Sequence, residues 1–349
     1  MRVALVKQVL DVHGPWAGVK WKDTSPTQLF EVWPGKALHW ELTCLLQADW
    51  YIVPVSVEGE YLNDAVRKHP GRARLIEQNT KKVTEVEAIP FEDYDLVISF
   101  DAILDISPGL PTVFAYYGQE HWDSLYICSL RRPVPGYDLF LAHMMDAPHE
   151  LRSLPQAISF PYPHDPQLVR SLFNPPRQEA AWADWRTPMT LANQGLGDPW
   201  CPEANAALER LRGVLNIDVR CRTTSLSASY AISDVLAWGD AAHYYRELAE
   251  CRYYIAVGRL GGAGQGLRDA AAVGCICIGQ ADRAYHRLLC HPTCLCEDMA
   301  QMPSRLRVLR ESADLQQEVL AWQDQKLKTH FRDAPLALLG EAIKLKRKS

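Results

Sequence analysis

The sequence lacks long apolar runs. A helix that crosses a bilayer needs about 18 to 20 consecutive apolar residues, and no stretch of the 349 residues approaches that length. The N-terminus also lacks the apolar core of a signal peptide, because Lys7, Gln8 and Asp11 soon follow the first apolar residues. We therefore expect a cytoplasmic protein.

An excess of charge of one sign is also missing. The chain has 37 Lys and Arg against 42 Asp and Glu, a formal net charge of −5, which argues against a nucleic-acid partner attracted by bulk charge. The exception is the basic tail at residues 344–348. We expect it to be the solvated end of a helix; the alternative is a weak peripheral contact with an anionic membrane, where each basic residue contributes about 1 kcal/mol.

None of the ten cysteines forms a Cys-x-x-Cys pair. Five candidate zinc ligands do crowd into residues 286–296: His286, Cys290, His291, Cys294 and Cys296. Their spacing differs from the usual zinc patterns, and Cys294 and Cys296 fit one face of a strand end. We expect reduced, apolar thiols and no metal, with a zinc site as the rival interpretation.

Short apolar runs alternate with helical patterns, which is typical of an α/β protein with parallel sheets. In the first half the runs predict strands, and apolar spacing at three and four residues predicts helices between them. The predicted strands are 2–9, 51–57, 94–100, 112–116 and 138–142, and the predicted helices are 36–46 and 61–69.

Five prolines between residues 160 and 177 separate two such sets of elements, and we expect no helix to run through them. The second set has strands at 189–192, 217–220, 253–257 and 275–278, and helices at 202–212, 241–251, 267–272, 315–327 and 336–345. We expect an N-terminal domain at 1–160, a proline-rich hinge at 161–187, a second domain at 188–330 and a C-terminal helix at 331–349.

The segment from Arg259 to Gly279 has the strongest chemical signal. A strand ends near Val257, a glycine-rich loop follows, and a short alanine-rich helix ends at Gly274. The free N–H groups and the dipole at the start of such a helix favour a phosphate, and Arg259 and Arg268 flank the loop. A plain tight turn is the alternative.

Two common phosphate motifs are absent from this segment. No Gly-Lys-Ser/Thr follows the glycines, so the loop is not a Walker loop. The Gly-x-Gly-x-x-Gly frame and its ribose-binding acid are missing too.

Residues 265–276, Gln-Gly-Leu-Arg-Asp-Ala-Ala-Ala-Val-Gly-Cys-Ile, resemble the donor-site helix of GT-B glycosyltransferases, including exostosin-type members. The resemblance implies two Rossmann-like domains facing each other across a cleft, with a nucleoside diphosphate sugar on the second domain. It places Asp269 where the family's acidic residue contacts the donor ribose or sugar. The implied donor-binding residues are Arg259, Gly264, Gln265, Gly266, Leu267, Arg268 and Asp269.

The segment departs from the family pattern in three ways. The acid is Asp rather than Glu, and the spacing from the Gly-Leu pair is two residues shorter. Residues 261–264 occupy the place of the family's other glutamate. Retention of the anomeric configuration is therefore not implied.

The resemblance extends to the N-terminal half only through its architecture. GT-B enzymes often have a glycine-containing loop after the first strand, facing the acceptor, and here it contains Gly14, Trp16 and Gly18. Aromatic rings form platforms for sugars, so we expect these residues to bind the acceptor. The alternative is that the tryptophans cover the domain surface.

A catalytic base is expected where a His or carboxylate follows a strand, because an inverting transfer needs one beside the acceptor hydroxyl. His121, His13 and Glu120 are the candidates. The sequence thus predicts a glycosyltransferase acting on a glycan or polysaccharide hydroxyl without a cofactor. A non-catalytic scaffold of the same fold and a nucleotide-sugar epimerase are the alternatives.

Overall fold

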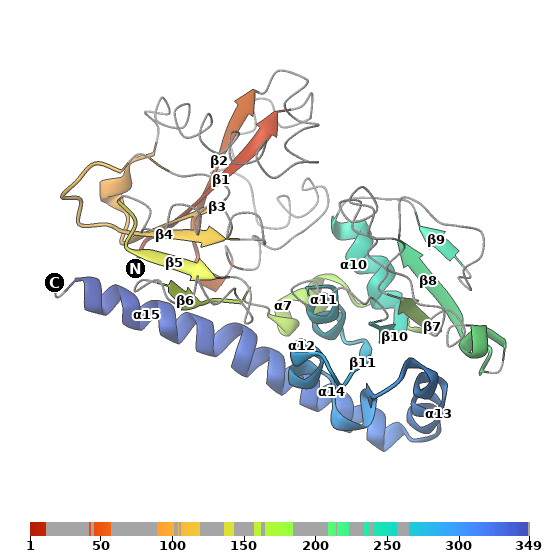
Figure 1. Ribbon diagram of the computed structural model, residues 1–349. Helices are drawn as coiled ribbons and strands as arrows, with labels where there is room; N and C mark the ends of the chain where they lie inside the picture. The colour runs from red at the N-terminus through yellow and green to blue at the C-terminus, as the bar shows by residue number, and fades with distance from the viewer. Residues whose placement is uncertain are drawn as a thin grey trace, which may run out of the picture. The chain divides into compact units, whose positions relative to one another are not determined.

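The computed structural model describes residues 1–11, 42, 45–56, 89–100, 104, 106–118, 136–142, 157–161, 165–183, 209–213, 215–222, 234–236, 241–256 and 265–347. The chain forms two compact units (Figure 1). The first unit is Met1–Leu29, Leu38–Pro163 and Ala334–Ser349; the second is Phe30–Ala37 and His164–Asp333.

A parallel sheet of six strands forms the centre of the first unit, in the order β2-β1-β3-β4-β5-β6. The strands are β1 Val3–Asp11, β2 Asp49–Ser56, β3 Leu96–Phe100, β4 Val113–Gly118, β5 Leu139–Ala142 and β6 Ala157–Ser159. The five strands predicted from apolar runs are confirmed. β6 was not among the strands predicted from apolar runs, because three residues are too few to give a periodic signal.

Aromatic side chains fill one face of this first sheet. Phe114, Tyr116 and Phe140 are buried together with Val6 and Val97, and the rings of Tyr116 and Phe140 stack with centroids 5.9 Å apart. These apolar residues come from four adjacent strands, so the face they cover fixes the register of the sheet.

The second unit contains another parallel sheet of six strands, in the order β12-β11-β10-β7-β8-β9. Its strands are β7 Gln178–Ala183, β8 Asp218–Arg222, β9 Asp234–Leu236, β10 Cys251–Ile255, β11 Ile276–Gln280 and β12 Leu295–Cys296. If these six strands are numbered 1 to 6 along the chain, their order in the sheet is 6-5-4-1-2-3. Read from the opposite edge, this is 3-2-1-4-5-6, the doubly wound order of nucleotide-binding folds. The order reverses between β7 and β10, and ligands of such sheets bind beside that point at the carboxyl ends of the strands.

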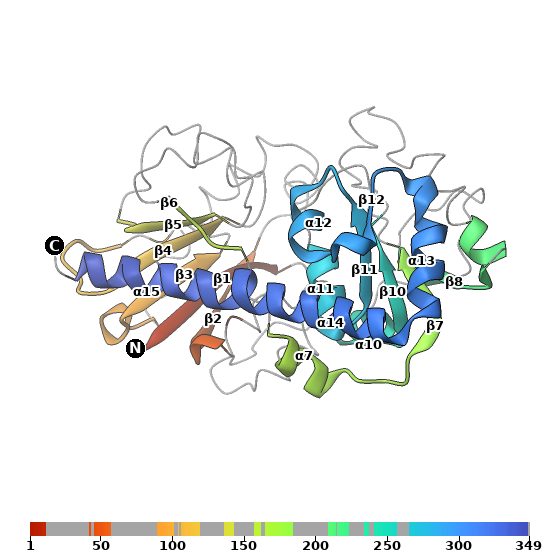
Figure 2. The same cartoon turned by 90° about the horizontal axis from the view of Figure 1, so that it is seen from below.

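Helices surround the second sheet (Figure 2). They are α7 Pro166–Leu172, α10 Ala241–Glu250, α11 Gln265–Val273, α12 Ala284–Leu289, α13 Met302–Glu311 and α14 Ala313–Lys328. α11 packs against α7, α10 and α14, so it is enclosed by other helices as well as by the sheet. The predicted helices at 241–251, 267–272 and 315–327 are confirmed, as are the strands at 217–220, 253–257 and 275–278.

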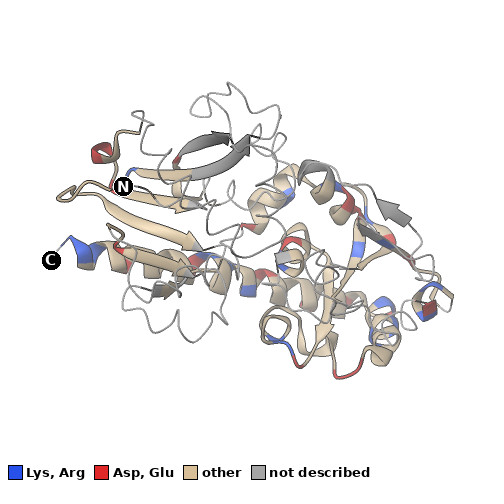
Figure 3. Ribbon diagram, turned by 45° about the horizontal axis from the view of Figure 1, so that its top comes forward, with Lys and Arg blue, Asp and Glu red and all other residues tan. Residues whose placement is uncertain are grey.

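The predicted C-terminal helix is α15, Ala334–Lys346, which belongs to the first unit. Pro335, Leu339 and Ile343 form its buried face. Its basic end, blue beside the C label in Figure 3, is engaged in ion pairs: Lys346 Nζ lies 2.7 Å from Asp138, and Arg347 pairs with Asp95. None of the helices in the described residues is long and apolar enough to cross a membrane.

The expectation that no helix forms between residues 160 and 177 is wrong. α7 occupies Pro166–Leu172, with Pro166 at its first turn, where proline is tolerated because that N–H has no helical partner. The Asp165 side chain accepts hydrogen bonds from the N–H groups of Gln167 and Leu168 and so caps the helix. The prolines therefore bound a short helix instead of preventing one.

Some predicted elements lie outside the described residues. The helix at 61–69 and the strand at 189–192 do so completely. Most of the helices at 36–46 and 202–212 do so as well, although residues 45–46 and 209–213 are helical.

Candidate functional site

The helix α11 begins at the carboxyl edge of the second sheet. In the sequence, α11 connects β10 to β11, and these two strands are parallel neighbours. The chain leaves β10 at the carboxyl edge of the sheet and must return along the helix to the opposite edge, where β11 begins. The N-terminus of α11 therefore points toward the edge where β7 and β10 end. That edge is where doubly wound sheets bind nucleotides, and a helix N-terminus presents free N–H groups to a phosphate.

The side chains of α11 are buried from Gly266 to Val273. Arg268 has no exposed surface, and its guanidinium carbon lies 5.3 Å from the centroid of the Phe331 ring. Phe331 comes from the π-helical turn Thr329–Asp333. A buried cation over an aromatic face is favourable because the ring face carries negative charge density, and this places a positive charge in the first turns of α11.

Asp269 is also buried, with 1% of its surface exposed. The hydroxyl of Tyr245 donates to its Oδ1 at 2.8 Å, and the hydroxyl of Tyr244 donates to Oδ2 at 3.4 Å. Tyr244 meets the ring of Trp182 edge to face at 5.8 Å. Trp182 lies near the end of β7 and Tyr244 in the first turn of α10, so the group lies at the point where the strand order reverses.

The end of α11 matches the sequence prediction. Gly274 has φ +89°, and its N–H donates to Ala271 O at 3.0 Å while Cys275 N–H donates to Ala270 O at 2.8 Å. This is a Schellman motif, in which a glycine is favoured because the left-handed conformation strains other residues.

Five of the predicted donor-site residues are described in the structure, and their binding role stays a prediction. Gln265, Gly266, Leu267, Arg268 and Asp269 are the first five residues of α11. The other predicted site residues lie outside the described residues and stay predictions: Arg259, Gly264, His13, Gly14, Trp16, Gly18, Glu120 and His121.

The sequence places residues 244–251 on a helix similar to the nucleotide-contacting layer of GT-B enzymes, but it predicts no contact with Asp269 or Arg268 for Tyr244, Tyr245 or Phe331. The two tyrosines lie 25 and 24 positions before Asp269, and Phe331 lies far beyond it. Each has an apolar ring that a sequence pattern assigns to the core. Only the three-dimensional packing shows that the tyrosine hydroxyls meet a carboxylate.

Five described cysteines of the second unit are buried apolar side chains in or near β11, α12 and β12. Cys275, Cys277, Cys290, Cys294 and Cys296 are all buried. His286 Nδ1 accepts a hydrogen bond from Gln280 N–H at 2.9 Å, which occupies one of its nitrogens. Within the described part of the chain, no three His, Cys, Asp or Glu side chains are placed to hold a metal ion.

Burial makes these thiols unreactive. It raises the pKa of Cys275 and of Cys296 to about 11, so at pH 8 only about one thiol in a thousand is the reactive thiolate. We expect iodoacetamide at pH 8 to modify these cysteines only after denaturant is added, as measured by mass spectrometry of their peptides. Fast labelling of Cys275 in the folded protein would contradict the buried arrangement.

Comparison with known proteins identifies the fold. No protein-family model matches the chain, and no curated protein sequence matches it significantly. An alpha-glucosyltransferase, solved in complex with UDP and a 13-mer DNA containing a central A:G mismatch, has a TM-score of 0.55 and 12% identity over 99% of this chain and 100% of that chain.

Two further solved structures are similar. HepE of Anabaena in complex with UDP and glucose has a TM-score of 0.53 and 10% identity over 99% of both chains. TarM has a TM-score of 0.50 and 8% identity over 80% of this chain and 58% of that chain. These are GT-B glycosyltransferases, so this chain has the GT-B fold, and the predicted α/β class with two Rossmann-like domains is confirmed.

Proposed function

We propose that this protein is a glycosyltransferase that moves a sugar from a nucleoside diphosphate sugar to a hydroxyl acceptor. The observation that carries the proposal is the position of α11, whose N-terminus lies at the switch-point edge of a doubly wound sheet in a GT-B fold. Solved structures of similar fold contain UDP, and we therefore propose a uridine diphosphate sugar as the donor.

The diphosphate would bind at the first turn of α11. The N–H groups of Gln265, Gly266 and Leu267 have no partner within the helix, and the dipole adds about half a positive charge there. The buried Arg268 cation adds to the same positive potential from a site of low dielectric constant. Negative charge that develops on the leaving diphosphate is stabilised by this field without a metal ion.

Asp269 would orient the donor ribose or sugar. An ionised carboxylate has about four acceptor positions, and the hydroxyls of Tyr244 and Tyr245 occupy two of them. Tyr244 is half-buried and adjoins Trp182 at the end of β7. We propose that the two tyrosines hold the carboxylate in one orientation and that its remaining acceptor positions receive donor hydroxyls.

The acceptor would be a hydroxyl of a glycan or polysaccharide, bound by Gly14, Trp16 and Gly18, with His121, His13 or Glu120 as the base. The alpha-glucosyltransferase of similar fold is solved in complex with DNA in several structures. A formal net charge of −5 gives this chain little general attraction to a polyanion, and we therefore favour an uncharged glycan over DNA.

Calorimetric titration with UDP and a thermal-shift screen of UDP-sugars test the donor site. Binding at a hundred times the dissociation constant stabilises the folded state by about 2.7 kcal/mol, so a clear rise in melting temperature is expected. Absence of binding by any nucleoside diphosphate would exclude the transferase. Release of a rearranged sugar nucleotide without an acceptor would instead identify an epimerase.

The Arg268→Met variant tests the positive charge at this helix. Methionine retains an apolar stem that packs on Phe331, but it removes the cation, so we expect the dissociation constant for UDP to rise about tenfold. The matched control is Arg246→Met, since Arg246 is an exposed arginine on α10. Equal UDP affinity in the parent and Arg268→Met would remove Arg268 from the donor site.

A further inference from the structure

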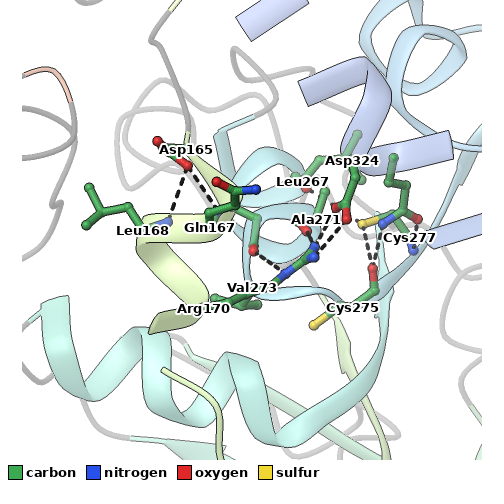
Figure 4. A network of polar contacts seen from close by, with 12 residues as sticks. Asp165, Gln167, Leu168, Arg170, Leu267, Ala271, Val273, Cys275, Cys277 and Asp324 are labelled. Atoms are coloured by element: carbon green, nitrogen blue, oxygen red, sulfur yellow. Dashed lines mark hydrogen bonds and ion pairs between the residues drawn. The ribbon is translucent and has the colours of Figure 1, made fainter. Parts of the chain in front are cut away.

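Two arginines near the start of the segment His164–Asp333 hold the C-terminal end of α11, and Figure 4 shows one of them, Arg170. Arg170 of α7 donates from Nε to Ala272 O and from Nη2 to Ala271 O, each at 2.9 Å. Arg177, just before β7, donates from Nη2 to Val273 O and from Nη1 to Cys251 O, the latter at 2.9 Å. The guanidinium groups thus contact three consecutive carbonyls of the last turn.

These contacts complete the hydrogen bonding of the helix end. The last four carbonyls of a helix lack intrahelical partners. The Schellman motif supplies N–H donors for Ala270 and Ala271, but it leaves Ala272 and Val273 without any. Arg170 and Arg177 donate to those two carbonyls. Since both arginines lie about a hundred residues before the helix, α11 is fixed to α7 and to the residue before β7, and not only to its sequence neighbours.

The same contacts alter the electrostatics of the helix. Asp324 of α14 pairs with Arg170 at 2.6 Å, whereas Arg177 has no carboxylate partner among the described residues. Arg170, Arg177 and Asp324 together carry a net positive charge. This charge lies at the C-terminal end of α11, where the helix dipole is equivalent to about half a negative charge. That pole lies only about 13 Å from the other end of a nine-residue helix. When the negative end of the helix is neutralised, less negative charge opposes the positive potential at the N-terminus of α11, and that potential becomes stronger.

We propose that Arg170 and Arg177 are positioning residues of the donor site. They touch neither donor nor acceptor; they act through α11, by fixing its position and by neutralising its negative pole, so that its first turn binds a diphosphate more tightly. This inference rests on the proposed function, because the ligand is the diphosphate of the nucleotide-sugar donor.

The first test is calorimetric titration of UDP into the full-length chain, carried out well below the melting temperature. We expect Arg170→Met and Arg177→Met each to raise the dissociation constant about three- to tenfold, because each removes a cation and its carbonyl hydrogen bonds at the helix end. Arg170→Lys retains the charge with a single donor group, so we expect it to restore part of the lost affinity.

The Asp324→Asn variant separates this role from a simple stabilising contact. It removes the anion that offsets Arg170, while Arg170 keeps its bonds to Ala271 and Ala272. We expect UDP to bind about twofold more tightly, because the negative pole is then better neutralised. If Arg170 and Asp324 acted only as an ion pair that holds the fold, Asp324→Asn would weaken UDP binding as Arg170→Met does.

Arg307→Met is the control, because Arg307 is an exposed arginine of α13. If the parent binds UDP and the Arg170 and Arg177 variants bind it equally well, the positioning role is wrong and the proposed function stands. The same holds if Asp324→Asn weakens binding as much as Arg170→Met. If the parent itself does not bind UDP, the proposed function is wrong, and this inference falls with it.

Discussion

Replacing Gly274 with valine is expected to destabilise the second unit by about 3 to 4 kcal/mol, which is a large part of the 5 to 15 kcal/mol that stabilises an ordinary domain. Gly274 has φ +89°, and the left-handed conformation costs an L-residue about 1 to 2 kcal/mol. A Cβ at this position would lie 2.8 Å from Arg177 Nη2 and 3.2 Å from Arg170 Nε. The added side chain therefore displaces both guanidinium groups from the end of α11.

Urea denaturation followed by circular dichroism measures this effect. Gly340→Ala is the matched control, since Gly340 lies within α15 and an added Cβ there has no neighbour within 4 Å. We expect that control to be neutral or stabilising by about 0.5 to 1 kcal/mol. A loss below about 1 kcal/mol in Gly274→Val would mean that the contacts at the end of α11 contribute little.

The sequence predicted the elements whose signals are local. Apolar runs identified β1, β3, β4, β10 and β11, and Gly274 marked the end of α11 because only a few residues tolerate a left-handed helix end. The glycine-rich approach to α11 predicted a phosphate site from the chemistry of a helix N-terminus alone. Such signals need no knowledge of which elements lie side by side.

Other features depend on contacts between distant segments and could not be predicted. β7 has the sequence Gln-Glu-Ala-Ala-Trp-Ala, whose alanines and lack of β-branched residues give no strand signal, and it lies within the stretch assigned to a hinge. Arg170 lies 102 residues from Ala272. The proline-rich sequence around it predicted no helix, and only the folded chain shows that Arg170 meets the end of α11.

Gln323 in α14 takes the place of a missing strand beside β11. β12 pairs only with Gly279 and Gln280, so the first part of β11 has no strand partner on its outer side. The Gln323 side chain is fully buried there. Its Oε1 accepts from Cys277 N–H at 2.9 Å, and its Nε2 donates to Cys275 O at 2.7 Å. One side-chain amide thus bonds two buried backbone groups; Cys275 O has besides it only the weaker donor Cys277 Sγ, at 3.6 Å, among the described residues.

Gln323→Leu is expected to lower the free energy of unfolding by about 2 to 5 kcal/mol, because each buried polar group left without a partner costs about 1 to 3 kcal/mol. The matched control is Gln325→Leu, an exposed position on the same helix, for which a change within about 0.5 kcal/mol is expected. Chemical denaturation of both variants measures the difference. Equal stability of the two would show that the Gln323 amide does not replace a strand.

Gln323→Glu adds a pH dependence whose sign follows from the same geometry. An ionised carboxylate still accepts from Cys277 N–H, but it cannot donate to Cys275 O, whereas the protonated acid can do both. Burial and the facing carbonyl raise the pKa of the glutamate in the folded state above its unfolded value of about 4.3. The variant should therefore approach parental stability below about pH 4 and lose stability as the pH rises toward 7. The protonated and the ionised side chain differ only in the proton that can be donated to Cys275 O. A stability difference from the parent that stays constant between pH 4 and pH 7 would therefore contradict a donor role for the amide.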